Sequence, residues 1–359
     1  MFSRSNPRTD PAPLTEYSAS ISASVAWSVP IGSGSDYGFA PLDVDGSVYA
    51  ASPSGRVVKV DTRSGDVGWQ ADTGHSLSAG VGSDGNTTVV AAADGTVIAL
   101  DSSGQEKWTA KAASDVNVPP AVGSDVVVVR SGDYRIQAFS TSDGELLWNV
   151  QRPGPALALK ASMQMRIVDG IVITGLPNGK LIAIDAQTGG VQWEGTVAVS
   201  QGATDLDRIS DVVGAPQLQG PLLCGVAYQG RMACFDISQG GDTVWSQTFS
   251  SAAGMAIDSA QAYAPDQRST VYAFGLGDGH EAWKQDALRN RRLAGPAVVE
   301  EAVAVGDFEG YVHFLDRADG QLLGRLHVGG GRIVSPLVGT EDGVIVQTGN
   351  GNLIRISLS

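Results

Sequence analysis

The chain consists mainly of short apolar runs separated by turns that contain glycine. Runs such as VIAL at 97–100, VVVV at 126–129 and IVIT at 171–174 are apolar at consecutive positions rather than at alternate ones. A strand has this pattern when both faces of its sheet are buried. The pattern therefore predicts an all-β protein whose sheets are covered on both sides.

One unit recurs along the chain: an apolar strand, a turn with glycine, and a second strand that carries Trp. Copies of this unit end at Trp69, Trp108, Trp148, Trp193, Trp245 and Trp283, and a further copy has Gly324 where Trp is expected. The intervals between these positions are 39, 40, 45, 52, 38 and 41 residues. Another pair of strands precedes each copy. Each unit therefore holds about four strands in 40–45 residues, which is typical of a propeller blade.

The two ends of the chain supply the parts of one more copy. Trp27 has no preceding strand, and NLIRISLS at 352–359 has no Trp strand after it. We therefore predict a single eight-bladed β-propeller of four-stranded blades over residues 21–359, closed by N- and C-terminal strands that share the last blade. The repeated Trp side chains, including Trp27, are expected to cover the junctions between blades. Residues 1–20, which contain three prolines, are predicted to form a flexible N-terminal tether.

Composition excludes several classes of partner. The chain of 359 residues has a net charge of −14, whereas affinity for nucleic acid comes mainly from Lys and Arg. We therefore expect no nucleic-acid partner. The longest uncharged stretch is interrupted by Pro and Gly, and the N-terminus has no apolar signal segment, so neither a transmembrane helix nor a signal peptide is expected.

The two cysteines lie in LLCGVAYQGRMACFD, at Cys224 and Cys234. A two-residue turn at Gln229-Gly230 would place Cys224 opposite Phe235, and the two thiols would then point to opposite faces of the sheet. This favours two buried free thiols, with a disulfide as the alternative. On this interpretation cysteine usage does not indicate a redox compartment.

Motifs for catalysis and for metal binding are missing from the sequence. The four histidines are scattered, without metal-ligand spacing, and no Gly-x-Ser-x-Gly nucleophile motif occurs. The glycine-rich stretch at 32–38 leads into strands rather than into the helix that a phosphate site requires. We therefore expect no enzyme activity, no cofactor and no metal.

The segment GATDLDRISDVVGAP at 202–216 differs from its surroundings because it concentrates charge, at Asp205, Asp207, Arg208 and Asp211. It connects the Trp strand of one blade to the first strand of the next, and residues 150–160 make the same connection one blade earlier. Connections of one class emerge on one face of a propeller, so the two segments should be neighbours. ALRNRRLAGP, with Arg289, Arg291 and Arg292, belongs to the same class two connections further on.

The repeat resembles that of the pyrroloquinoline-quinone-type propeller superfamily. Within it, GATDLDRISDVVGAP and GDFEGYVHFLDRADG resemble segments of the BamB family, and the resemblance extends from about residue 23 to 359. It implies a non-enzymatic periplasmic scaffold of the outer-membrane β-barrel assembly machinery, held to the outer membrane by an N-terminal lipidated cysteine. That acyl-acceptor cysteine is missing here, so the anchor is an inference. The implied partner is a POTRA domain of BamA and, through it, the other subunits; contact with nascent outer-membrane proteins stays open.

The resemblance also implies docking residues. Leu157, Leu159 and Lys160 occupy the family positions of two leucines and an arginine, although Lys loses the bidentate geometry of Arg. Asp211 matches a family aspartate, whereas Val213 stands where a second is common. The acids would then face a basic partner, with the leucines as apolar anchors.

Two alternatives to docking stay open for these residues. The leucines would belong to the core if they began an inner strand, and the acids would be structural if they capped a turn or paired with Arg208. Two alternatives also exist for the function: a quinoprotein dehydrogenase, whose adjacent active-site cysteines this chain lacks, and a scaffold of another envelope complex.

Overall fold

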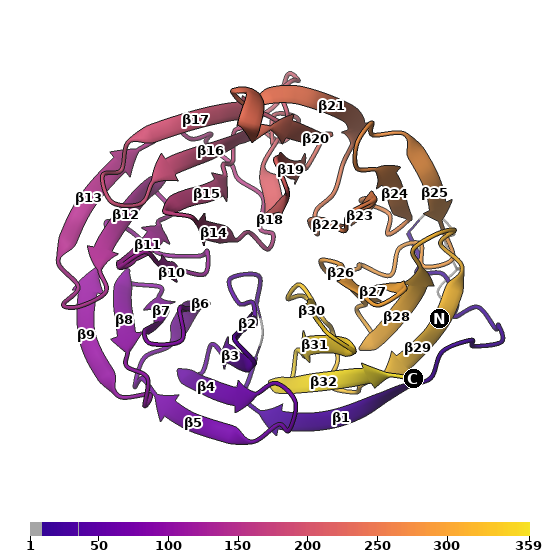
Figure 1. Cartoon of the computed structure of the whole chain (residues 1–359), viewed down its shortest axis with the longest axis horizontal. Helices are drawn as coiled ribbons and strands as arrows, with labels where there is room; N and C mark the ends of the chain where they lie inside the picture. Colours follow the sequence, from indigo (N-terminus) through magenta and orange to yellow (C-terminus); the bar gives the residue numbers. More distant parts are fainter. Residues whose placement is uncertain (1–8, 35) are drawn as a thin grey trace, which may run out of the picture.

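The computed structural model describes residues 9–34 and 36–359. The strands of these residues form separate four-stranded antiparallel sheets, which are arranged as blades around a common axis (Figure 1). The molecule is an eight-bladed β-propeller, as the repeat predicts. Each blade has strands A, B, C and D from the centre of the ring outward.

The blades are numbered in chain order, and seven of them consist of four consecutive strands. Blades 1 to 4 comprise β2 (Leu42–Val44), β3 (Ser47–Ala51), β4 (Arg56–Asp61) and β5 (Val67–Asp72); β6 (Leu77–Ser83), β7 (Thr88–Ala92), β8 (Thr96–Leu100) and β9 (Glu106–Lys111); β10 (Ala121–Gly123), β11 (Val126–Arg130), β12 (Arg135–Ser140) and β13 (Leu146–Gln151); and β14 (Met165–Val168), β15 (Ile171–Gly175), β16 (Lys180–Asp185) and β17 (Val191–Thr196). Blades 5 to 7 comprise β18 (Val212–Gln219), β19 (Leu222–Ala227), β20 (Gly230–Asp236) and β21 (Asp242–Phe249); β22 (Ala256–Ile257), β23 (Gln261–Pro265), β24 (Val271–Gly275) and β25 (Glu281–Gln285); and β26 (Ala297–Val299), β27 (Ala302–Gly306), β28 (Tyr311–Asp316) and β29 (Leu322–His327). A short 3₁₀ helix, η1 (Ile237–Gln239), lies between β20 and β21.

Blade 8 is made from both ends of the chain. It contains β30 (Val338–Thr340), β31 (Gly343–Gln347), β32 (Asn352–Leu358) and, as its D strand, β1 (Ala23–Pro30). β1 is antiparallel to β32, with Ala23 opposite Leu358 and Pro30 opposite Asn352. The predicted split blade is therefore confirmed, and the first strand of the chain closes the ring beside the last.

The hydrophobic core lies between neighbouring blades. Strands β7 and β11 are buried at every residue, which explains why the apolar runs are consecutive. The D strands are exposed at several positions, as in β13. Residues next to and within the A strands of all eight blades line a central cavity of about 610 Å³.

The repeated Trp side chains cover the blade junctions. Trp108 packs on the C–D turn of the next blade, where a Cβ on Gly144 would lie 2.6 Å from the indole. Its Nε1 donates to the carbonyl oxygen of Thr141 at 3.0 Å. The same hydrogen bond to the next blade is made by Trp27, Trp148, Trp245 and Trp283. Trp69 and Trp193 differ, because both rings are partly exposed. The buried Nε1 of Trp69 has no partner among the described residues.

Gly324 replaces Trp in blade 7 because the next blade has no C–D turn for an indole to cover. The C and D strands of blade 8 are the two chain ends, and Ile21 occupies the space beside Gly324, where a Cβ would lie 2.9 Å from Ile21 Cγ1. The backbone N–H groups of Ser20 and Ile21 donate to the carbonyl oxygen of Leu323. Within the predicted tether, residues 1–8 lie outside the described residues, whereas residues 10–20 contact the propeller; the division at residue 20 stays a prediction.

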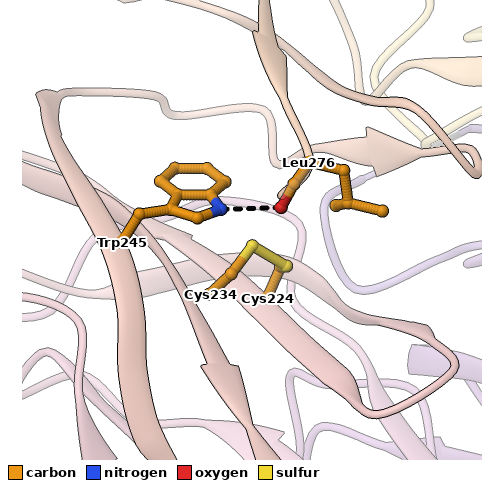
Figure 2. Close-up of a disulfide and its surroundings, with 4 residues drawn as sticks. All are labelled: Cys224, Cys234, Trp245 and Leu276. Carbon is orange, nitrogen blue, oxygen red and sulfur yellow. Dashed lines mark hydrogen bonds between the residues drawn. A yellow bond between two sulfur atoms is a disulfide. The ribbon is translucent and has the colours of Figure 1, made fainter. Parts of the chain in front are cut away.

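The prediction of two free thiols is wrong, because Cys224 and Cys234 form a disulfide (Figure 2). The turn is centred on Gln229, which has a left-handed φ of 48°, rather than between Gln229 and Gly230. The strand register therefore differs by one residue, and Cys224 faces Cys234 across β19 and β20. The disulfide is buried beside Trp245.

Candidate partner-docking site

Antiparallel blades place their connections on two opposite faces of the ring. The A–B and C–D turns lie on one face, which we call the turn face. The B–C turns and the D–A connections between blades lie on the other, which we call the connection face. Residues 152–164 connect blades 3 and 4, and residues 197–211 connect blades 4 and 5. Both segments predicted to dock a partner therefore belong to the connection face.

The connection at 152–164 is fixed by Tyr134, from the B–C turn of blade 3. The Tyr134 hydroxyl donates to the carbonyl oxygen of Pro155 at 2.9 Å. Gly154 lies flat against the same ring, where a Cβ would come within 1.9 Å of it. The backbone N–H of Arg152 donates to the carbonyl oxygen of Tyr134 at 3.3 Å. A loop without strand structure is thereby held in one position relative to blade 3.

Asp211 joins the two docking segments. Its Oδ2 accepts a hydrogen bond of 2.6 Å from the backbone N–H of Leu159, which confirms that the segments are neighbours. Its side chain is buried, and Oδ1 has no partner among the described residues. Burial raises the pKa of Asp211 to about 6, partly offset by the Leu159 hydrogen bond and by the charge of Arg130. Arg130 is itself buried, which lowers its pKa to about 10.

The acidic segment forms a compact turn at the surface. Asp207 accepts hydrogen bonds from the Thr204 hydroxyl at 2.7 Å and from its backbone N–H at 3.2 Å, which lowers the pKa of Asp207. Arg208 Nε donates to the carbonyl oxygen of Gly202 at 3.1 Å. Asp205 is exposed beside them. Hydrogen bonds within the turn thus fix its conformation, while Asp205, Asp207 and Arg208 stay accessible.

Three large apolar side chains are exposed on these two connections. Leu157 is 44% exposed, Val199 64% and Leu206 65%. Sequence reasoning identified Leu157 but missed Val199 and Leu206, although an isolated Leu between acids in a segment without a strand pattern is a usable signal. Exposed leucines next to ordered charges suit a protein partner rather than a small ligand.

The predicted docking residues therefore divide into surface and supporting groups. Leu159 is partly buried against the core between blades, and Lys160 pairs with Asp36 at 3.1 Å while staying exposed. Asp211 was expected to meet a basic partner, but it is fully buried and cannot do so. A carboxylate there positions Leu159 instead, and a charge reversal at Asp211 would disturb the fold rather than the docking surface alone.

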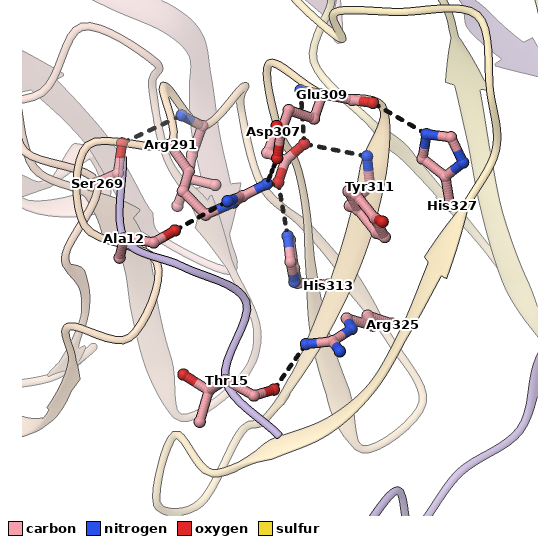
Figure 3. Close-up of polar contacts among 11 residues, drawn as sticks. Ala12, Thr15, Ser269, Arg291, Asp307, Glu309, Tyr311, His313, Arg325 and His327 are labelled. Carbon is pink, nitrogen blue, oxygen red and sulfur yellow. Dashed lines mark hydrogen bonds and ion pairs between the residues drawn. The ribbon is translucent and has the colours of Figure 1, made fainter. Parts of the chain in front are cut away.

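The third connection of this class, between blades 6 and 7, contains a buried charge cluster (Figure 3). Arg291 Nε lies 2.7 Å from Asp307 Oδ2, which also contacts His313 Nε2 at 2.9 Å. Burial alone would raise the pKa of Asp307, but hydrogen bonds from His313 and Arg291 hold it below its ordinary value. Burial lowers the pKa of His313 despite Asp307. Arg291 is thus a structural residue, and Arg289 and Arg292 stay exposed.

No group of three or more His, Cys, Asp or Glu side chains in the described part of the chain is placed to hold a metal ion. Across residues 9–34 and 36–359, no helix has the length and apolar character needed to cross a membrane.

Comparison with known proteins gives a consistent set of relatives. A family model described as outer membrane protein assembly factor BamB matches residues 53–285 and 267–359. The protein of that name from Bordetella pertussis is 58% identical over 356 residues, covering 99% of this chain and 92% of its own. Its counterpart in Burkholderia pseudomallei is 36% identical over 347 residues, covering 96% and 91%.

Solved structures share the fold at lower identity. The crystal structure of BamB from Moraxella catarrhalis has a TM-score of 0.85 at 24% identity, covering 94% of this chain and 100% of that one. A quinohemoprotein alcohol dehydrogenase from Comamonas testosteroni has a TM-score of 0.72 at 14% identity, covering 93% and 76%. At these identities the likeness establishes the propeller and nothing of the chemistry.

Proposed function

Because the chain belongs to the BamB family, we propose that it is a non-enzymatic scaffold subunit of the outer-membrane β-barrel assembly complex. The relatives that match it over almost its whole length are named as outer membrane protein assembly factors. The quinoprotein alternative rests on a shared propeller at 14% identity. The chain also lacks the adjacent cysteines expected of such enzymes.

We propose further that it docks to a POTRA domain of BamA through Leu157, Leu159, Lys160, Asp205, Asp207 and Arg208, with Asp211 in support. The observation that carries this proposal is the hydrogen bond between Leu159 and Asp211, because it unites the two connections into one surface. That surface combines exposed leucines with ordered charges. Protein–protein interfaces typically have such an apolar centre surrounded by a polar rim.

The buried disulfide supports a periplasmic location. Disulfides persist in oxidising compartments such as the bacterial periplasm and are rare in the cytosol. We propose that the propeller lies at the periplasmic face of the outer membrane, and that an N-terminal lipid anchor, as the family resemblance implies, holds it there. Contacts with other subunits would follow from docking to BamA.

A binding experiment with a matched control tests the docking surface. Leu157→Ala combined with Leu206→Ala removes two exposed anchors. As the control, Leu146→Ala combined with Leu147→Ala removes two leucines on β13 that are also exposed. Affinity for isolated BamA POTRA domains would be measured by biolayer interferometry. The first variant should bind at least about tenfold more weakly, since truncating an interface anchor costs about 1–2 kcal/mol.

The control variant should bind as the unchanged protein does, and circular dichroism should show both variants folded. Equal affinity of the two variants would refute the docking surface. Loss of binding through unfolding would do the same.

A further inference from the structure

The two faces of the propeller differ in charge. On the turn face, all A–B turns except the one between β18 and β19 carry an acid, including Asp45, Asp84, Asp125, Asp169, Asp258 and Glu301. Most C–D turns add further aspartates. The cationic side chains of these turns, all of which the structure describes, are Arg63 and Arg317, and both are already paired with acids of the same face. The turn face is therefore strongly acidic.

The connection face carries exposed cations on the loops around one edge. Arg268 lies in the B–C turn of blade 6, Arg292 in the connection from blade 6 to blade 7, and Arg332 in the connection to blade 8. Arg289 is exposed beside Arg292, although Asp286 lies 3.8 Å from it. These loops and the B–C turn of blade 7 also carry Asp266, Asp286, Asp307 and Glu309, so this edge between blades 6 and 8 is close to neutral, in contrast to the acidic turn face.

Residues 10–21, which we call the strap, run from the turn face to this edge along the outside of blade 7. At the turn-face end, the backbones of Ser22 and Ser359 exchange hydrogen bonds. Midway, Arg325 donates to the carbonyl oxygen of Thr15 at 2.7 Å. At the connection face, Arg291 donates to the carbonyl oxygen of Ala12 at 2.9 Å (Figure 3).

The first contacts of the strap along the chain define where its described part begins. The N–H of Ala12 donates to the carbonyl oxygen of Arg289 at 2.8 Å, and Asn290 Nδ2 donates to that of Asp10 at 3.0 Å. Both partners belong to the connection between blades 6 and 7. The described part of the N-terminal segment therefore begins at the connection face, at this edge of blades 6 to 8.

A charged surface would interact electrostatically only with the nearer face of this molecule. Blade strands of five or six residues separate the two faces by about 17–20 Å. Charges are screened within about 8 Å at physiological ionic strength. An anionic bilayer attracts nearby Lys or Arg and repels Asp or Glu. Because of this separation, an anionic bilayer would repel the turn-face acids when that face is the nearer one, but not the near-neutral edge of the connection face.

We propose that the connection face is a lipid-facing surface, which turns toward an anionic bilayer when the N-terminus is held there, while the acidic turn face points away. This inference rests on the proposed function, because that function supplies the membrane tether. Because the candidate docking site lies on the connection face, a partner docked there would approach the propeller from the membrane side.

Fluorescence quenching on vesicles tests the orientation. A histidine tag ahead of Met1 would hold the protein on phosphatidylcholine vesicles that contain a nickel-chelating lipid and a headgroup nitroxide, with or without phosphatidylglycerol. Single fluorophores on Ala93→Cys and Asn86→Cys form a matched pair, because these exposed positions lie at opposite ends of β7 in the same blade. Cys224 and Cys234 are joined as a disulfide and do not compete for the label.

With the N-terminal tag, the label at position 93 should be quenched severalfold more than the label at 86, and the difference should grow when phosphatidylglycerol is present and shrink at high salt. Moving the tag behind Ser359, which lies on the turn face, should reverse the order in neutral vesicles. Equal quenching of the two labels would overturn the proposal, as would a difference that ignores the anionic lipid or an order that ignores the tag position. POTRA binding is measured in solution without lipid, so failure of one test leaves the other intact.

Discussion

Two side chains that do not form the surface of the candidate docking site fix its shape. Tyr134 holds Pro155 by a hydrogen bond and packs against Gly154, and Asp211 accepts the N–H of Leu159. Tyr134 also has a left-handed φ of 65°, which residues other than glycine rarely adopt. The exposed Leu157 therefore lies between two fixed points, and its position depends on residues that a partner would not touch.

The raised pKa of Asp211 predicts a pH-dependent contribution to stability. The pKa is about 6 in the folded protein against an ordinary value of 3.8, so between these values the folded state keeps a proton that the unfolded state has lost. Stability from this group is fully present below about pH 4 and is lost as the pH rises through about 6. Relative to Asp211→Asn, the free energy of unfolding should fall by about 2–2.5 kcal/mol between pH 4 and pH 7.

Urea unfolding of both proteins across this pH range measures the difference. Arg130 stays protonated throughout, so loss of its neighbouring charge in Asp211→Asn shifts the variant's stability by a constant. Asp207→Asn is the control: it keeps Asp211, and Thr204 lowers the pKa of Asp207, so the wild type should lose no stability relative to this variant as the pH rises. Parallel curves for the wild type and Asp211→Asn would contradict the assignment of a buried, ionisable carboxylate.

The blade junction is the element that the sequence predicts best. The Trp side chains recur at nearly fixed intervals, and each one meets the glycine of the next C–D turn, as Trp108 meets Gly144. This contact can be predicted from a single sequence, because the same Trp and glycine pattern recurs at six other junctions. No repeated pattern predicts the turn at Gln229 or the burial of Asp211. Each occurs once, and each depends on a single backbone conformation or on packing between distant segments.

Unequal Trp environments predict unequal losses of stability. Trp108→Ala should lower the free energy of unfolding by about 3–5 kcal/mol, because it empties a buried indole site between two blades. Trp69→Ala should cost clearly less, since that ring is partly exposed and its Nε1 makes no hydrogen bond to the described residues. Urea denaturation of the two variants provides the comparison, and equal losses would count against the junction model.

The disulfide should strengthen blade 5. Replacing it through Cys224→Ala and Cys234→Ala should lower the free energy of unfolding by about 2–3 kcal/mol, because the bond restricts a loop of about eleven residues in the unfolded chain. Thermal unfolding of the oxidised protein with and without reductant gives the same comparison independently. Alkylation under denaturing, non-reducing conditions should label neither cysteine; labelling of both would restore the free-thiol interpretation.

Closure of the ring combines a strand exchange with the strap. β1 completes blade 8, and the residues just before it fill the place beside Gly324 where other blades carry Trp. The sequence shows the missing Trp and the half-blades at both ends. It does not show that the proline-containing N-terminal segment compensates for them, because these contacts use backbone carbonyls of the strap, such as those of Ala12 and Thr15, which leave no pattern in its sequence.

A double-mutant cycle at Gly324 tests whether the strap is part of the folded propeller. In the full chain, Gly324→Ala would place a Cβ 2.9 Å from Ile21 Cγ1, so overpacking should lower the free energy of unfolding by about 1–3 kcal/mol. Deleting residues 1–21 should also destabilise the protein, whereas deleting residues 1–9 should change little. In the shorter chain the Ile21 side chain is gone and position 324 has no left-handed φ, so Gly324→Ala should be neutral or stabilising by up to about 1 kcal/mol, as in other strands. In urea unfolding, Gly324→Ala should therefore cost less free energy of unfolding in the shortened chain than in the full chain. Equal costs in the two chains would mean that the strap does not occupy this site in solution.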